Sequence, residues 1–212
     1  MVQDIKTGTT TVGLIYDSGV VLAADQRASM GHIAYDDESE KVYRITSNLA
    51  VTNAGNVGDS LTIIRFLKSH ARLYELERNE KMTATAATTF ISNILNGNRH
   101  YPYIVQLIIG GYNGKASLFD LTPYGGILER DKFAVSGSGT EQALNTLDLG
   151  YKKNMTEKEA ITLCIKAIES GKRRDLYSGG VSSTVFIIDD KGVQQIKKEK
   201  IDAIIKEVAI KL

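Results

Sequence analysis

Stretches of apolar and β-branched residues alternate along the chain with turn-forming residues, a pattern that predicts a series of β-hairpins. The predicted strand pairs are Thr9–Tyr16 with Val20–Asp25, Val42–Ile45 with Leu49–Asn53, Val105–Gly111 with Lys115–Asp120, and Ser182–Asp189 with Val193–Lys197, and one more strand is predicted over Lys132–Ser136. The run Val105–Gly111 is almost wholly apolar, which indicates a strand buried on both faces. The segment Met30–Lys41 is polar and is expected to be irregular.

Elsewhere, apolar residues recur every three or four positions, as they do on the buried face of an amphipathic helix. The predicted helices cover Gly58–Asn79, Thr83–Asn96, Thr140–Leu149 and Thr156–Lys172, and a short amphipathic helix ends the chain. Leu61 and Leu67 fall on the predicted buried stripe of the first helix. The fourth helix opens with Thr156 and Glu159 at the positions of a capping box and is predicted to stop at Gly171.

The order of these elements is strands, two helices, strands, two helices and strands, without the alternation of strand and helix that builds a parallel sheet. It predicts an α+β fold, a four-layer αββα sandwich of two mostly antiparallel sheets with helix pairs outside. At 212 residues the chain can bury a substantial core. No linker or internal repeat divides it, so we expect one domain.

The pairing of the first hairpin decides which side chains meet near its open end. A three-residue turn would place Thr9 opposite Arg27. The same pairing places Thr11 opposite Asp25. Opposed residues share a face of a hairpin, so these four side chains are expected to cluster. A change of one residue in the pairing would distribute them over both faces.

Composition and charge narrow the classes of function. The formal net charge is +1 and there is no tryptophan, so we expect neither nucleic acid nor a membrane as a partner. No stretch approaches the roughly 20 apolar residues of a membrane span, and the leader Met1–Gly8 lacks the apolar core of a signal peptide. Cys164 is the only cysteine, which suits a reducing compartment. We therefore expect a cytoplasmic protein.

No residue pattern points to a metal or another cofactor. His32, His70 and His100 lack the spacing of metal ligands. Cys164 lies on the apolar side of a predicted helix, which is typical of a core residue rather than a nucleophile. We expect catalysis, if the chain is an enzyme, to rely on its own side chains.

Thr9 is the candidate nucleophile. A threonine hydroxyl needs a base, and an N-terminal threonine carries one in its own α-amino group, whose ordinary pKa is about 7.7–8.0. That amine exists only if the Gly8–Thr9 bond is cut. Gly8 has no side chain, so the leader can approach the site closely. Taken alone, however, Thr9-Thr10-Thr11-Val12 also reads as the ordinary beginning of a β-strand.

The motif around Thr9 is followed by further motifs along the rest of the chain. In order, the whole set is Gly8-Thr9-Thr10-Thr11-Val12-Gly13, Ala23-Ala24-Asp25-Gln26-Arg27-Ala28-Ser29, Lys41, Asn53-Ala54-Gly55-Asn56-Val57-Gly58-Asp59, Ser136-Gly137-Ser138-Gly139 and Arg174-Asp175-Leu176-Tyr177-Ser178-Gly179-Gly180. In these motifs the sequence resembles the β subunits of the proteasome, most closely those of archaeal type, from Gly8 to the C-terminus. The resemblance implies the N-terminal-nucleophile hydrolase fold and a threonine endopeptidase. It also implies a propeptide over residues 1–8, removed by autocatalytic cleavage at Gly8–Thr9, and a peptidase domain over residues 9–212.

The resemblance assigns roles that are physically reasonable. The catalytic residues that it implies are Thr9, Asp25, Lys41, Ser138, Asp175 and Ser178. Thr9 would supply the attacking oxygen and, after processing, the base. The ammonium of Lys41 would stabilise the alkoxide-like state and would itself be held by Asp25. The backbone N–H of Gly55 would stabilise the oxyanion, Arg27 would brace the site, and the remaining three residues would surround the α-amine.

The resemblance also implies a set of substrate-binding residues. They are Ala28, Ser29, Ser39, Tyr43, Asn53 and Val57. Backbone groups near Ser29 and Gly55 would pair with an extended peptide. Asn53 departs from the family pattern, because archaeal relatives usually carry an apolar side chain there. A buried amide needs polar partners, so we expect the pocket to accept a large apolar residue poorly.

The implied assembly consists of heptameric β rings, stacked face to face and flanked by rings of α subunits, which degrade unfolded proteins in an enclosed chamber. The β ring would contain this subunit alone or together with a second kind of β subunit. Two other functions stay open. The chain could be an unprocessed structural β subunit that supports active neighbours, or a different N-terminal-nucleophile amidohydrolase acting on a small amide.

Two of the candidate residues also have simpler interpretations. Lys41 lies next to Glu40 in an acidic segment, where a lysine is often a solvated partner of surface carboxylates. Asp25 could be a turn residue, a common role of aspartate.

Overall fold

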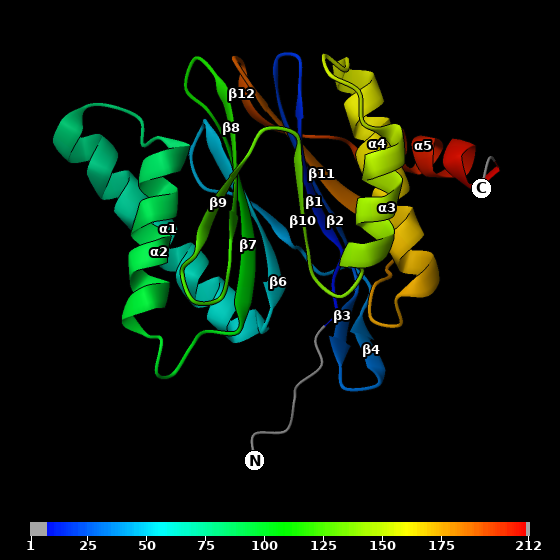
Figure 1. Cartoon of the computed structure of the whole chain (residues 1–212), viewed down its shortest axis with the longest axis horizontal. Coiled ribbons are helices and arrows are strands. Elements are labelled where there is room, and N and C mark those ends of the chain that lie inside the picture. The colour runs from blue at the N-terminus through cyan, green and yellow to red at the C-terminus, as the bar shows by residue number, and fades with distance from the viewer. Residues whose placement is uncertain (1–7, 211–212) are drawn as a thin grey trace.

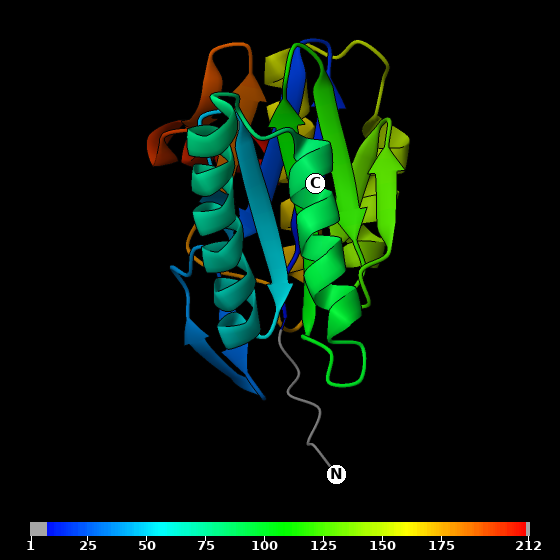
Figure 2. The same ribbon diagram turned by 90° about the vertical axis from the view of Figure 1, so that its left-hand side faces the viewer.

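Four layers build the molecule, as the computed structural model of residues 8–210 shows. Helices α1 (Val57–Arg78) and α2 (Ala84–Gly97) cover one sheet, and α3 (Thr140–Gly150) and α4 (Glu157–Arg174) cover the other (Figure 1). Figure 2, turned by 90°, shows α1 and α2 side by side in front of their sheet. The predicted α+β fold with four αββα layers is confirmed. Residues 1–7 of the predicted leader lie outside the described residues.

Each main sheet has five strands, and every neighbouring pair in both sheets is antiparallel. The first sheet contains, in spatial order, β10 (Phe133–Ser136), β1 (Thr11–Tyr16), β2 (Gly19–Asp25), β11 (Ser183–Asp189) and β12 (Gly192–Gln195). The second contains β5 (Val42–Arg44), β6 (Leu49–Gly55), β7 (Val105–Tyr112), β8 (Ala116–Leu121) and β9 (Ile127–Arg130). The last helix, α5 (Lys198–Ile210), packs against α4 and β11.

Buried apolar side chains fill the three spaces between the layers. Along β1 the side chains alternate, so that Val12 and Leu14 pack toward α3 and α4 while Gly13 faces the second sheet. A Cβ at Gly13 would lie 2.7 Å from a methyl carbon of Leu118 and 2.8 Å from one of Ile108. The two sheets therefore meet closely at this point, and a larger residue would push them apart.

The predicted helices agree with the structure within two residues at each end. The capping box is confirmed, because the Thr156 N–H donates to Glu159 Oε2 at 2.8 Å and the Glu159 N–H donates to Thr156 Oγ1 at 3.4 Å. The predicted stop at Gly171 is wrong, since α4 continues to Arg174. Gly171 is buried inside the helix, where the missing side chain leaves room for Thr10.

Several short strands were not predicted. The segment expected to be irregular contains β4 (Ile33–Asp36), which pairs with β3 (Ala28–Met30) in a two-stranded ribbon. Its strands are largely exposed, so they lack the alternation of apolar and polar residues that identifies a half-buried strand. On α1, the expected burial of Leu61 is wrong, since it is 37% exposed and Ile63 takes the inner position.

The first hairpin is paired one residue away from the expected register. Its turn holds two residues instead of three, because Gly19 belongs to β2 and pairs with Tyr16. Thr11 therefore lies opposite Ala24, and the predicted clustering of the four odd-numbered residues on one face is wrong. A Cβ at Gly19 would overlap the carbonyl oxygen of Ile188, so only glycine fits as the first residue of this strand.

Candidate active site

Asp25, the last residue of β2, is the centre of a buried hydrogen-bond network. Its Oδ1 accepts from Lys41 Nζ at 2.7 Å and from the Thr10 N–H at 2.9 Å. Its Oδ2 accepts from the N–H groups of Gly179 at 2.8 Å and Arg27 at 3.2 Å. The residue is fully buried, and a buried charge is tolerated only when such donors replace water. Asp25 is therefore a fixed negative charge and not a solvated turn residue.

Lys41 lies just before β5 and is only 5% exposed. Besides its contact with Asp25, its Nζ lies 3.4 Å from the carbonyl oxygen of Gly8. Burial lowers the pKa of Lys41 below its ordinary value, and the neighbouring Asp25 carboxylate opposes part of that shift. The simpler interpretation of Lys41 as a solvated surface lysine is wrong.

Thr9 is buried with its hydroxyl directed at the bond that precedes it. Thr9 Oγ1 donates to the carbonyl oxygen of Gly8 at 2.5 Å, the same oxygen that Lys41 approaches. Gly8 fits there because it has no side chain, since a Cβ would overlap the Cβ of Tyr177. The hydroxyl, the ammonium and the carbonyl of the Gly8–Thr9 bond thus meet at one point.

Three further candidate residues form a chain of hydrogen bonds that reaches the backbone nitrogen of Thr9. The Thr9 N–H donates to Ser138 Oγ at 3.1 Å. The hydroxyls of Ser138 and Ser178 both donate to Asp175 Oδ2 at 2.5 Å. Ser138 lies just before α3 and Asp175 directly follows α4, so the ends of two helices position this group. The structure therefore brings together all six residues that the sequence suggested as catalytic.

Gly55 ends β6 and borders a small cavity beside Thr9. Its φ of 119° is in the region that favours glycine, and a Cβ would overlap the carbonyl oxygen of Ile104. The cavity has a volume of about 270 Å³. Arg27 lies to one side, with Nε 2.9 Å from Asp37 Oδ1, an ion pair that suits a bracing role.

Sequence reasoning missed most of the residues that line this cavity. Besides Thr9, Gly55 and Ser138, they are Ala54, Ile104, Val105, Gln106, Pro123 and Gly137. Val105 and Gln106 begin a strand that the pattern did predict, but apolar periodicity does not show which end of a strand meets a site. Ala54 and Gly137 belong to quoted motifs, and those motifs were the only signals in the sequence for these two residues.

The residues suggested for substrate binding do not line the cavity beside Thr9. Several are engaged locally: Ser29 Oγ donates to the Tyr177 carbonyl at 3.0 Å, and the Ser39 N–H donates to the Gln26 carbonyl at 2.9 Å. Tyr43 donates its hydroxyl to the Glu40 carbonyl at 2.6 Å, and burial raises its pKa to about 12. Asn53 is buried, whereas Ala28 is partly exposed and Val57 exposed. Their contact with a substrate stays a prediction.

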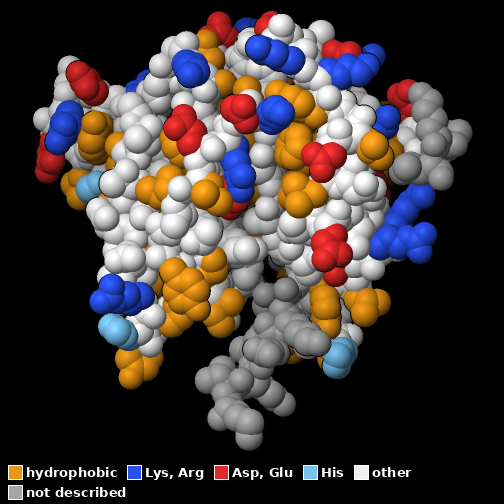
Figure 3. Space-filling model, viewed as in Figure 1, with side chains coloured by type: hydrophobic (Ala, Val, Ile, Leu, Met, Phe, Trp, Pro, Cys, Tyr) orange, Lys and Arg blue, Asp and Glu red, His pale blue; other side chains and the backbone are white. Residues whose placement is uncertain are grey.

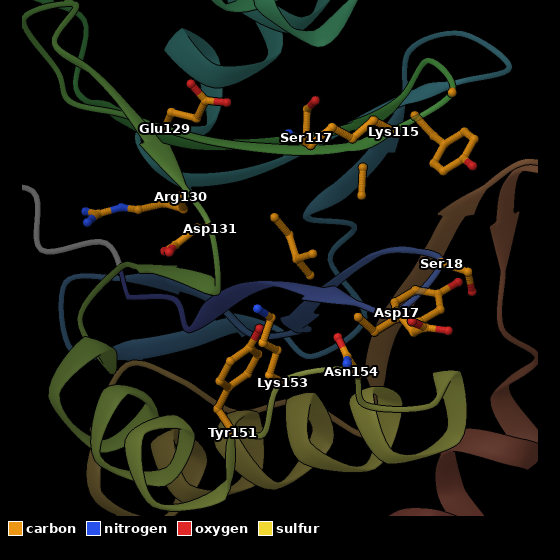
Figure 4. Close-up of a pocket in the computed structure, with 15 residues that line it drawn as sticks. Asp17, Ser18, Lys115, Ser117, Glu129, Arg130, Asp131, Tyr151, Lys153 and Asn154 are labelled. Carbon is orange, nitrogen blue, oxygen red and sulfur yellow. The ribbon is translucent and has the colours of Figure 1, made fainter.

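A larger cavity, of about 620 Å³, lies at the other end of β1 (Figure 4). The β1–β2 turn, with Asp17 and Ser18, forms part of its wall, and Tyr151, Lys153 and Asn154 approach it from the α3–α4 connection. It contains no residue of the Thr9 network. Convergent polar groups, and not cavity size, therefore identify the candidate active site.

Within residues 8–210, no cluster of three or more histidine, cysteine, aspartate or glutamate side chains is arranged to hold a metal. Over the same part of the chain, no helix has the length and apolar character needed to cross a membrane. Cys164 is fully buried against the first sheet, and burial raises its thiol pKa. Its prediction as a core residue is confirmed.

Comparison with known proteins identifies similar sequences over almost the whole length. Residues 5–187 match the family model described as "Proteasome subunit". The chain is 44% identical over 212 residues to "Proteasome subunit beta" of Methanocaldococcus fervens, covering 99% of this chain and 94% of that protein. It is 44% identical over 213 residues to the protein of that name from Methanococcus vannielii, covering 99% of this chain and 96% of that protein. It is 40% identical over 211 residues to the one from Methanocaldococcus jannaschii, covering 99% of this chain and 94% of that protein.

Proposed function

Because the chain belongs to the proteasome subunit family as a β subunit, and these β subunits are threonine-type N-terminal-nucleophile peptidases, we propose that Thr9 is the nucleophile of this one. Removal of residues 1–8 activates it, and residues 9–212 form the peptidase. One observation carries the proposal: Thr9 Oγ1 and Lys41 Nζ both contact the carbonyl oxygen of Gly8.

This arrangement supports an intramolecular cleavage. The Thr9 hydroxyl attacks the Gly8 carbonyl carbon and its proton is transferred to the Thr9 nitrogen, while the Lys41 ammonium stabilises the negative charge that develops on the carbonyl oxygen. The C–N bond then breaks, which leaves Gly8 esterified to Thr9 Oγ1 and releases the Thr9 nitrogen as an amine. Water hydrolyses the ester, and the leader departs with the Gly8 carboxylate.

The same residues serve the cleavage of a substrate. The new α-amine of Thr9 remains beside Ser138 Oγ, which lies 3.1 Å from this nitrogen before cleavage. It takes the proton from Thr9 Oγ1 as the hydroxyl attacks a peptide carbonyl. Lys41, held by Asp25, stabilises the attacking oxygen, and the Gly55 N–H stabilises the oxyanion. The protonated α-amine gives this proton to the nitrogen of the departing peptide as the C–N bond breaks and the acyl-enzyme forms, and water then hydrolyses the acyl-enzyme.

We expect Gly8→Ala to block leader removal. A methyl group on residue 8 overlaps Tyr177, so the Gly8 carbonyl no longer lies beside Thr9 Oγ1. Intact mass of this subunit from assembled particles should show loss of residues 1–8 in the wild type and their retention in the variant. Wild-type particles that cleave peptides through this subunit with the leader still attached would overturn the proposal.

The matched control is the Gly8→Ala chain freed at Thr9 by removing an N-terminal fusion. It should be active, because residue 8 is absent from the mature protein. If it is inactive, removal of residues 1–8 is not sufficient to activate the subunit. If wild-type particles keep the leader and lack activity, the unprocessed structural role is the correct one.

The rate should also fall at alkaline pH. The proposed role of Lys41 requires the protonated amine, so kcat decreases as the pH rises through its pKa, which burial places below the ordinary 10.5. The Lys172 charge lowers the pKa of Lys41 further, and Lys172→Ala should therefore move this decrease to higher pH. The measurement is kcat against pH for wild-type and Lys172→Ala particles. A decrease of kcat that moves to lower pH in the variant would contradict the role assigned to Lys41.

Assembly into proteasome particles follows from the family, and its details belong to the proposal. We infer heptameric β rings, of this subunit alone or with a second β subunit, between rings of α subunits, with unfolded proteins as substrates. Met30, Ile33 and Tyr35 on β3–β4, and Leu176 nearby, are exposed apolar residues that support such contacts. Figure 3 shows hydrophobic side chains exposed at the lower end of the molecule, where β3 and β4 lie in Figure 1.

Substrate preference and location also belong to the proposal. The residue before the scissile bond would contact the set that includes Tyr43 and Asn53, and the buried amide of Asn53 favours residues other than large apolar ones. A panel of peptide aminocoumarin amides that differ in this residue measures the preference directly. A cytoplasmic location is supported by the single, unpaired cysteine.

A further inference from the structure

Thr10, the residue after the proposed nucleophile, is fully buried, and its hydroxyl contacts Ser178 of the candidate site. Thr10 Oγ1 lies 2.8 Å from Ser178 Oγ. Ser178 is itself 1% exposed, so no solvent competes for this contact. The hydrogen bonds therefore run continuously from Thr10 through Ser178, Asp175 and Ser138 to the nitrogen of Thr9.

The direction of these hydrogen bonds follows from the number of protons. The Ser178 hydroxyl has one proton, and it donates that proton to Asp175 Oδ2, because a carboxylate can only accept. The 2.8 Å contact must then use the Thr10 proton, so Thr10 donates to Ser178. Thr10 thus fixes the rotation of the Ser178 hydroxyl and keeps its proton directed at Asp175.

The packing around Thr10 holds its hydroxyl in this position. A Cβ at Gly139, the residue before α3, or at Gly171, within α4, would overlap Thr10 Oγ1. The Thr10 N–H also donates to Asp25 Oδ1, which fixes the backbone. Two glycines, one just before α3 and one within α4, thus leave the space that this side chain occupies.

We propose that Thr10 is a positioning residue of the peptidase: its hydroxyl orients Ser178, and through Asp175 and Ser138 it holds the Thr9 amine in place to act as the base. This inference rests on the proposed function. Thr10 does not touch the substrate, so it affects the rate of the chemical steps and not the binding of the peptide.

The test is Thr10→Val, which keeps the size and branching of the side chain but cannot donate. In assembled, processed particles, we expect kcat for a short peptide aminocoumarin amide to fall about three- to tenfold, the effect of one net hydrogen bond, with KM unchanged. Thr10→Ser should recover most of the lost rate. Combined with Ser178→Ala, Thr10→Val should cause no further loss, because both changes break the same path.

Thr11→Val is the matched control. Thr11 is equally buried, but its hydroxyl lies 2.7 Å from Ser136 Oγ, outside the network, so kcat should stay at the wild-type value. An equal loss in both valine variants, or full kcat in Thr10→Val, would overturn the inference. If Thr10→Val particles do not assemble, Thr10→Ala is measured instead, and a wild-type kcat in assembled Thr10→Ala particles would also overturn the inference. If any of these results is found while Thr9→Ala particles are inactive, the inference on Thr10 fails but the proposed function stands.

Discussion

Thr9→Ala should abolish both leader removal and peptidase activity while the fold is retained. The substitution removes the hydroxyl that contacts the Gly8 carbonyl oxygen and that we propose as the nucleophile, and loss of a nucleophile lowers the rate by several orders of magnitude. The hydroxyl makes one local hydrogen bond, to Gly8, so the free energy of unfolding should fall by no more than about 2 kcal/mol. Intact mass, peptide cleavage and thermal unfolding of assembled particles measure the three effects.

Two variants control this experiment. Thr9→Ser keeps a hydroxyl at the same position and should retain processing and activity. Thr11→Ala removes the same atoms from a neighbouring buried threonine and should also leave both in place. Peptide cleavage by Thr9→Ala particles above the background rate measured without particles would refute the role of Thr9.

Lys41→Ala should lower kcat/KM by about a hundredfold or more, the loss expected when a charged stabiliser of the reacting oxygen is removed. Leader removal should slow as well, because the ammonium approaches the Gly8 carbonyl oxygen. The variant also leaves Asp25 buried without its cationic partner, which costs about 3–5 kcal/mol when one member of a buried pair is deleted. Activity must therefore be measured well below the melting temperature of the variant.

Lys172→Ala separates the catalytic loss from the structural one. Lys172 is another part-buried lysine close to the site; it pairs with Glu169 at 2.8 Å and donates to the Ser182 carbonyl at 2.7 Å. Its removal should destabilise the particle but leave kcat near the wild-type value at neutral pH. If both lysine variants lose activity in proportion to their lost stability, Lys41 is a structural residue.

The layers of the fold could be predicted because they follow from local patterns. Helical periodicity, the capping box at Thr156 and the turn residues between apolar runs each act over a few residues. The exposed strands β3 and β4 carry no such pattern, so the sequence alone did not distinguish them from a loop. The error in the first hairpin came from Gly19, whose place in the strand depends on a contact with Ile188, a residue distant in sequence.

Sequence motifs named the residues of the hydrogen-bond network around Thr9, but not their geometry or the other residues that line the cavity. Motif resemblance suggested Asp175 and Ser178, yet spacing along the chain does not reveal that the segment after α4 brings them to Ser138 and so to Thr9. The role of Thr10 was missed, because a threonine in a strand looks ordinary until its partners are known. Gly139 and Gly171, whose missing side chains leave space for Thr10, do not by themselves indicate this contact in the sequence.

The position of Thr10 between α3 and α4 has a mechanical consequence. Ser138 precedes the first of these helices and Asp175 follows the second, so the hydrogen bond between them spans the junction of the outer layer. A displacement of one of these helices along the other would change the distance between Ser138 and Asp175. The surroundings of the Thr9 nitrogen therefore depend on how α3 and α4 lie against each other.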